Sequence, residues 1–357
     1  MHDSARTLNG LGQSLWLDNI TRGLLRAGTL EDYRDRCAVT GLTSNPTIFE
    51  HAIKGGDDYD AAIRADASTD PEAVFFDLAI DDLRNAAKVF EPIHQRTSGV
   101  DGWVSLEVSP LLADDTAHTI EQAVALHERA GIANLYIKVP GTTAGAGAIE
   151  ELIYRGVPIN VTLLFSPKQY QAVADAYMKG LERRLAEGLS LDVASVASVF
   201  ISRWDVKVAK AVPEEMHNQL GLAVAGSIYA RYRDVLASPR MQRLMNEGAR
   251  PQRLLWASTG TKDPAASDTL YVDSLAAPFT VNTIPEKTLL AVVDHGQPGA
   301  LMSADDSAAR AVQASFAERG LEVDPLAETL QDEGAASFVK SWNDLLDTIR
   351  QRMEKAA

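Results

Sequence analysis

Three ionisable residues stand out because each lies in, or ends, a short apolar run of the sequence: Asp18, Glu107 and Lys138. An amine in an apolar interior is shifted toward its neutral, nucleophilic form, which can attack a ketone to give an imine. The protonated imine then withdraws electrons while an adjacent C–C bond breaks, and nearby carboxylates move the protons. The alternative is a structural ion pair between Lys138 and one of the two carboxylates.

Polar and apolar residues alternate along several of these runs. In Val104–Ser109 the two sets are Val, Leu, Val and Ser, Glu, Ser, and in Ile159–Leu164 the polar set holds an asparagine and a threonine. Successive strand side chains point to opposite faces, and helices must pack on the outer face of a parallel barrel. One such strand alone fits an exposed edge equally well, but repetition favours polar residues inside a barrel, near its mouth. The residues expected at or near this mouth are Asp18, Asn45, Glu107, Lys138, Asn160, Thr162, Ser202 and Ser258.

The elements that must position these residues follow a strand–helix alternation. Helical spacing is clear in Thr116–Ala130 and in Pro167–Ala186, where Ser166 is an N-cap followed by a first-turn proline. An open dinucleotide-binding sheet is the alternative, but its glycine fingerprint does not follow the first strand candidate. Eight strands in this alternation favour a closed barrel. The eight strand candidates are Ser14–Asp18, Ala38–Thr43, Trp103–Ser109, Leu135–Val139, Pro158–Phe165, Ala194–Ser202, Arg253–Ser258 and Phe279–Ile284.

The predicted fold is therefore an α/β class (β/α)8 barrel with two sets of additional helices. One set is expected between Pro46 and Val100, after the second strand, and the other after His295, with helical patterns at Ala304–Arg319 and Leu326–Lys355. We expect one domain over residues 1–357, with the barrel at about 13–296 and a C-terminal helical extension at about 300–357.

Composition limits the function classes. The 34 basic and 49 acidic residues give a net charge of −15, which repels nucleic acids and anionic membranes, so neither is an expected partner. An anionic substrate would need a local basic pocket. No apolar run reaches the roughly 18 residues of a membrane span, the N-terminus lacks a signal-peptide core, and Cys37 is the one cysteine. A cytoplasmic protein is expected.

Weaker signals concern phosphate and metal binding. Arg203, Ser258, Thr259 and Lys262 lie at or beyond the sixth and seventh strand candidates, where barrel enzymes often hold a phosphate. A solvated loop explains the same residues. The seven histidines form neither HxH nor HExxH, so a histidine-based metal centre is not expected.

The sequence closely resembles the transaldolases, in the longer form found in many bacteria, from about Trp16 to His295. The resemblance is carried by Gly41–Phe49 (GLTSNPTIF), Leu135–Gly141 (LYIKVPG), Ile159–Ser166 (INVTLLFS), Ser198–Asp205 (SVFISRWD), Leu255–Lys262 (LWASTGTK), Tyr271–Asp273 and Val281–Pro285. It implies an α/β barrel, no metal or organic cofactor, and sugar phosphates as small-molecule partners. It also implies reversible transfer of a dihydroxyacetone unit from sedoheptulose 7-phosphate or fructose 6-phosphate to glyceraldehyde 3-phosphate or erythrose 4-phosphate, in the non-oxidative pentose phosphate pathway.

The resemblance also implies residue roles. Lys138 would form the imine, Asp18 would take the proton of the C4 hydroxyl, and Glu107 and Thr162 would position a water. The dihydroxyacetone hydroxyls would be held by Asn45, Asn160 and Ser202.

The match departs from the family at the phosphate end. Shorter transaldolases have arginines where this chain has Lys207 and Gly260, so Arg203 and Lys262, with Ser258, are the phosphate candidates here. Two other functions remain open: a Schiff-base aldolase that releases free dihydroxyacetone, and a non-catalytic binding barrel. The sequence is compatible with a monomer or a homodimer.

Overall fold

The protein forms a barrel of eight parallel strands, seen in a computed structural model that describes residues 4–356. The strands are β1 (Gln13–Asp18), β2 (Val39–Thr43), β3 (Val104–Glu107), β4 (Leu135–Pro140), β5 (Ile159–Leu164), β6 (Ser195–Phe200), β7 (Arg253–Ala257) and β8 (Thr280–Ile284). All eight predicted strands are confirmed, and their ends shift by one or two residues at most. The sixth is the clearest shift, because β6 ends at Phe200 and Ser202 is the first residue of a helix.

The strand order is β2-β1-β8-β7-β6-β5-β4-β3, so β2 and β3 must meet to close the barrel. At this seam the Leu42 amide donates to the Trp103 carbonyl at 3.0 Å. The Ser44 hydroxyl donates to the Ser105 carbonyl at 2.7 Å. Gly41 permits the approach, because a Cβ there would lie 2.6 Å from the Trp103 carbonyl oxygen. The predicted (β/α)8 class is confirmed.

Helices cover the outside of the barrel, and two of them have the predicted bounds. Asp115 caps the first, and Ser166 caps the second through a hydrogen bond from the Gln169 amide at 3.2 Å. These are α7 (Thr116–Ala130) and α9 (Pro167–Ala186). The others around the barrel are α1 (Ser4–Gly10), α2 (Arg22–Arg26), α3 (Thr29–Arg36), η1 (Pro110–Leu112), α8 (Thr143–Tyr154), α10 (Ser202–Val208), η2 (Ala209–Ala211), η3 (Glu214–Met216), α11 (Leu220–Ala237), α12 (Pro239–Asn246), α13 (Leu270–Ser274) and α14 (Glu286–His295).

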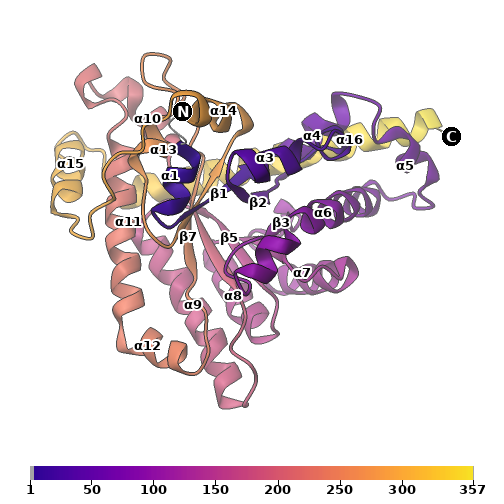
Figure 1. Cartoon of the computed structure of the whole chain (residues 1–357), viewed down its shortest axis with the longest axis horizontal. Helices are drawn as coiled ribbons and strands as arrows, with labels where there is room; N and C mark the ends of the chain where they lie inside the picture. Colours follow the sequence, from indigo (N-terminus) through magenta and orange to yellow (C-terminus); the bar gives the residue numbers. More distant parts are fainter. Residues whose placement is uncertain (1–3, 357) are drawn as a thin grey trace.

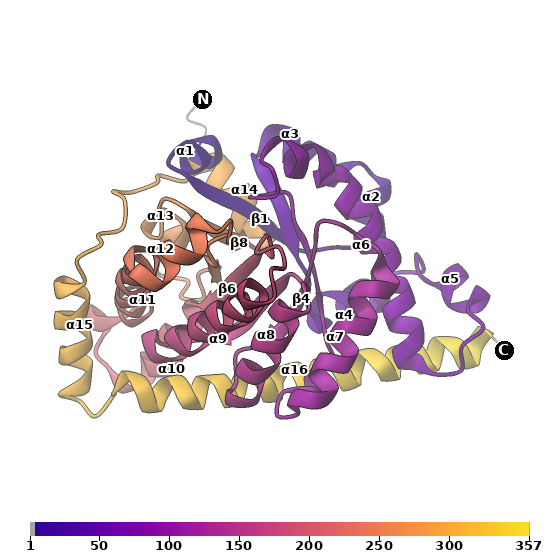
Figure 2. The same ribbon diagram turned by 90° about the horizontal axis from the view of Figure 1, so that it is seen from below.

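The additional helices lie where they were predicted. After β2 the chain forms α4 (Pro46–Lys54), α5 (Asp60–Ala65) and α6 (Pro71–Arg96), and after the barrel it forms α15 (Ser307–Ala317) and α16 (Val323–Ala356). Figures 1 and 2 show α16 as a long yellow rod that runs alongside α4 to α5, where the chain ends.

Aromatic residues bind α16 to the barrel's other helices. Trp342 of α16 is fully buried, and its ring lies 5.1 Å from that of Phe75 on α6, edge to face. The Ser341 hydroxyl accepts a hydrogen bond from Thr47 of α4 at 2.8 Å. The extension therefore packs on the barrel, and the single-domain division of residues 1–357 stays a prediction.

The barrel interior is polar in layers. Near the N-terminal ends of the strands, Arg253 and Asp101 both bind the Ser14 hydroxyl, at 2.7 and 2.6 Å. In the middle, Asn160 bridges β3 and β6 by donating to the Ser105 hydroxyl at 3.2 Å and accepting from Ser198 at 2.6 Å. The third layer, at the C-terminal ends, holds the ionisable residues described below.

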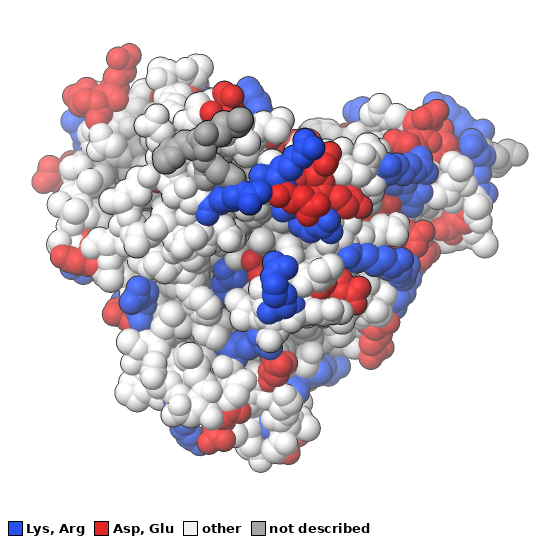
Figure 3. Space-filling model, viewed as in Figure 1, with Lys and Arg blue, Asp and Glu red and all other residues white. Residues whose placement is uncertain are grey.

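The surface bears mixed charge. On the face shown in Figure 3, basic side chains are interspersed with acidic ones. No helix among residues 4–356 is both long enough and apolar enough to cross a membrane.

Candidate active site

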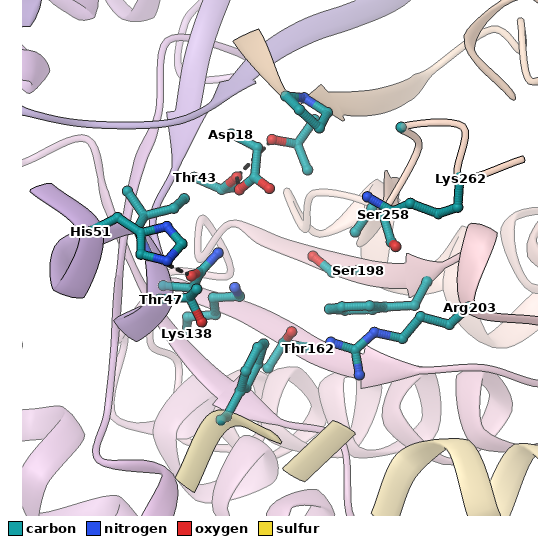
Figure 4. A pocket seen from close by; sticks show the side chains of 18 residues that line it. Asp18, Thr43, Thr47, His51, Lys138, Thr162, Ser198, Arg203, Ser258 and Lys262 are labelled. Carbon is teal, nitrogen blue, oxygen red and sulfur yellow. Dashed lines mark hydrogen bonds between the residues drawn. The ribbon is translucent and has the colours of Figure 1, made fainter. Parts of the chain in front are cut away.

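A cavity of about 320 Å³ opens at the C-terminal ends of the strands, where barrel enzymes carry their active sites. Side chains from the strand ends, from α4 and α10 and from the C-terminal helix α16 form its wall. Figure 4 shows Lys138 and Asp18 on one side of it and Arg203, Ser258 and Lys262 on the other. The lining residues are Asp18, Thr43, Asn45, Thr47, Ile48, His51, Lys138, Thr162, Ser198, Phe200, Arg203, Ala257, Ser258, Gly260, Lys262, Thr283, Pro285 and Phe338.

Lys138 enters this cavity from the middle of β4, and its side chain is only 6% exposed. Its Nζ lies 3.2 Å from Glu107 Oε2 and donates to the Ser44 carbonyl at 3.3 Å. The ring of Phe338 on α16 lies over the same nitrogen, 5.7 Å from Nζ to the ring centroid. The amine thus has one carboxylate, one carbonyl and an aromatic face around it, and it borders open space.

Glu107 stands beside Lys138 because β3 and β4 pair in register at these two residues. Burial raises the pKa of the Glu107 carboxyl; the Lys138 charge opposes that shift and Asp18 adds to it. The 3.2 Å contact with Nζ is an ion pair without aligned hydrogen-bond geometry. A carboxyl with a raised pKa and an imperfect partner is suited to accept and return a proton.

Asp18 ends β1 on the same side of the cavity as Lys138, across from the phosphate candidates (Figure 4). Thr43 donates to its Oδ1 at 2.7 Å and shares a second contact of 2.6 Å with Thr283. Burial raises the Asp18 pKa, while Lys138, the Thr43 hydrogen bond and Lys262 act against the shift. Two carboxyls with raised pKa values thus face one amine, which is an arrangement typical of acid–base chemistry.

Thr162 lies two residues after Asn160 on the interior face of β5 and lines the cavity, next to an irregularity at the C-terminal end of the strand. The register with β6 shifts between Val161 and Leu164, and Leu163 adopts a left-handed φ of 63°. Such a conformation in a leucine is unfavourable and persists only where neighbours hold it. Gln331 of α16 donates to the Leu163 carbonyl at 2.9 Å, and the Thr162 hydroxyl is buried without a hydrogen-bond partner among the described residues.

Of the three residues expected to hold the dihydroxyacetone hydroxyls, one lines the cavity and two lie behind its wall. Asn45 lines the cavity, and its Oδ1 accepts a hydrogen bond from the Ile48 amide at 3.0 Å. Asn160 lies one layer deeper, fully buried, and Ser198 lies between that layer and the cavity. Ser202 is also outside the wall, and its hydroxyl lies 2.8 Å from that of Ser258.

The phosphate candidates lie together on the far side of the cavity (Figure 4). Arg203 is half-buried against Phe200, with Cζ 5.3 Å from the ring centroid, and burial lowers its pKa. Lys262 is exposed at the rim, and Ser258 adopts a left-handed φ of 55°. Lys207 is not in the wall, because it pairs with Glu333 of α16.

Several lining residues were not predicted. Phe338 comes from a helix whose position over the mouth no local pattern indicates, and Thr47 and His51 come from the first turns of α4. Thr43, Ser198 and Phe200 had a usable signal, since each lies on a predicted strand. Among residues 4–356, no group of three or more His, Cys, Asp or Glu side chains is placed to hold a metal ion.

Comparison with known proteins agrees with this geometry. The family model described as transaldolase/fructose-6-phosphate aldolase matches residues 15–349. The chain belongs to the transaldolase family. It is 43% identical to a transaldolase of Parafrankia sp. (strain EAN1pec) over 98% of each chain. It is 42% identical to one of Mycobacterium tuberculosis (98% of this chain, 97% of the relative) and 43% identical to one of Thermobifida fusca (99% of each).

The match to the transaldolase family model covers the whole cavity. The matched segment, residues 15–349, contains every cavity-lining residue, and it extends over most of α16, including position 338. The family match therefore includes most of the C-terminal helix as well as the barrel.

Proposed function

We propose that the protein is a transaldolase that transfers a dihydroxyacetone unit from sedoheptulose 7-phosphate to glyceraldehyde 3-phosphate, giving erythrose 4-phosphate and fructose 6-phosphate, in the non-oxidative pentose phosphate pathway. The observation that supports it most is the buried amine of Lys138, which borders the cavity between two carboxyls with raised pKa values. Family membership over residues 15–349 supports the same reaction.

In the first half-reaction, Lys138 Nζ attacks the C2 carbonyl of the ketose, and loss of water gives the imine. Asp18 takes the proton of the C4 hydroxyl while the C3–C4 bond breaks, and the electron pair moves into the protonated imine to form an enamine. The aldose phosphate leaves. Asp18 lies at the cavity wall within the electric field of Lys138, which fits this role.

In the second half-reaction the enamine carbon attacks the acceptor aldehyde, and Asp18 returns its proton to the new hydroxyl. Water then hydrolyses the imine and frees Lys138. We assign the proton transfers at Nζ to Glu107, acting through a water that Thr162 helps to hold. The buried, unpartnered Thr162 hydroxyl and the imperfect Glu107–Lys138 contact support this assignment.

The rest of the substrate lies along the cavity. Asn45 and Ser198 border the space next to Lys138, so we assign them to the dihydroxyacetone hydroxyls, with Asn160 orienting Ser198 and Ser202 orienting Ser258 from behind. Arg203, Ser258 and Lys262 form the phosphate end. This local positive charge serves an anionic substrate in a protein of net charge −15.

Release of free dihydroxyacetone is the related alternative, and no feature of the cavity favours it. The two reactions differ in their need for an acceptor. Fructose 6-phosphate should be consumed rapidly with erythrose 4-phosphate present and only at background without it. Equal rates in both conditions would assign the aldolase reaction, and no consumption in either would contradict both.

Two further properties belong to the proposal. Phosphorylated sugars carry charge and do not cross membranes unaided, so we propose a cytoplasmic location for the enzyme. A monomer and a homodimer both remain compatible with the exposed helices.

A further inference from the structure

Lys207, which the resemblance to shorter transaldolases compares with a phosphate-binding arginine, does not line the cavity. Lys207 forms an ion pair with Glu333 of α16 and is absent from the cavity wall, whereas Arg203 lines it. Arg203 and Lys207 are four residues apart on α10, so both face α16 from the same side of their helix. Two cations and one carboxylate therefore share this contact between α10 and α16.

Arg203 lies close to the same part of α16. A Cβ added at Gly334 would lie 3.2 Å from Arg203 Nη1, so the guanidinium rests against the residue that follows Glu333. The negative charge of Glu333 acts on the Arg203 pKa in the raising direction, against burial. Yet Arg203 forms no ion pair with Glu333 or any other carboxylate among the described residues.

This arrangement leaves the Arg203 guanidinium available to an incoming anion. A carboxylate paired to Arg203 would have to be displaced by each substrate phosphate, which would weaken binding. Glu333 is 53% exposed and has a flexible side chain, so only its partner restrains it. That partner is Lys207.

We propose that Lys207 is a positioning residue that holds Glu333 away from Arg203 and so keeps Arg203 free for the substrate phosphate. The inference rests on the proposed function, because it concerns the phosphate end of the same cavity. Lys207 acts through Glu333 and does not touch the substrate. An exposed pair of this kind supports an effect of about two- to fivefold on affinity.

The test compares the wild type with Lys207→Gln, Glu333→Gln and the double variant. We expect Lys207→Gln to raise the KM for fructose 6-phosphate about two- to fivefold at unchanged kcat. Glu333→Gln should have a KM no higher than the wild type, and the double variant should recover the wild-type value. Lys210→Gln, which removes an exposed charge from the same segment, is the matched control and should change nothing.

Two results would overturn the inference. An unchanged KM in Lys207→Gln would show that Glu333 is not restrained by it. A raised KM that persists in the double variant would show that Lys207 contacts the phosphate directly.

Calorimetric titration with inorganic phosphate separates this inference from the proposed reaction, since it needs no turnover. Weaker phosphate binding in Lys207→Gln, restored in the double variant, would support it even if fructose 6-phosphate were not a substrate. Equal affinities in all four proteins, or no phosphate binding by the wild type, would contradict it.

Discussion

Replacing Phe338 by alanine tests the contribution of α16 to the site. The ring is 6% exposed, lies over Lys138 Nζ and packs edge to face on Phe200, with 6.5 Å between ring centroids. Truncating a buried phenylalanine costs about 3–5 kcal/mol, of which the cation–π contact accounts for about 0.5–2. Because the ring borders a cavity, we expect a loss near the lower end, about 3 kcal/mol.

Removing the Phe338 ring also gives water access to Lys138 Nζ. We therefore expect Phe338→Ala to accumulate less of the reducible Lys138 adduct with fructose 6-phosphate, because the imine hydrolyses sooner. Phe316→Ala is the matched control, since Phe316 is fully buried on α15, away from the cavity. Urea unfolding and borohydride trapping measure the two effects. Equal adduct levels in the two variants, or an unchanged unfolding free energy in Phe338→Ala, would refute the reasoning.

Two further predictions concern the barrel seam and the acid–base residues. Gly41→Ala should lower the unfolding free energy by about 1–3 kcal/mol, because its Cβ would lie 2.6 Å from the Trp103 carbonyl oxygen. Gly56→Ala is the control, because a Cβ there would meet open space. Equal losses of stability in urea unfolding of the two variants would contradict this account. Asp18→Asn should slow C–C cleavage yet still form the adduct, and a folded variant that forms no adduct would argue against the assigned role. Burial raises the Asp18 pKa in the native state above its ordinary value of 3.8. The native wild-type protein therefore loses stability relative to the unfolded chain as pH rises from 3.8 through the raised pKa. The unfolding free energy of Asp18→Asn, relative to that of the wild type, should therefore increase with pH. A variant that is more stable than the wild type only at low pH would contradict this prediction.

The strands and two covering helices were predictable because their physical signals are local. Strands buried on both faces show up as short apolar runs, and polar residues such as Glu107 and Lys138 break that pattern only at the interior. The bounds of α7 and α9 follow from Asp115 and Ser166, which satisfy amides at the helix starts.

How far each polar side chain lies below the barrel mouth was not predictable. The alternation of side chains along a strand tells which face a residue is on, but not which layer of the barrel interior it occupies. Asn160 was expected at the mouth and lies beneath Ser198. The path of α16 depends on contacts between residues far apart in the sequence, such as Thr47 with Ser341. The left-handed Leu163 is equally non-local, since Gln331 from α16 helps to hold it.

The central claim is that Lys138 forms an imine with the ketose. Incubation with fructose 6-phosphate, reduction with borohydride and peptide mass mapping test it directly. We expect the mass of a reduced sugar-derived adduct on Lys138, and neither adduct nor activity in a folded Lys138→Met variant. An unmodified Lys138 in the wild type, together with retained activity in Lys138→Met, would contradict the mechanism.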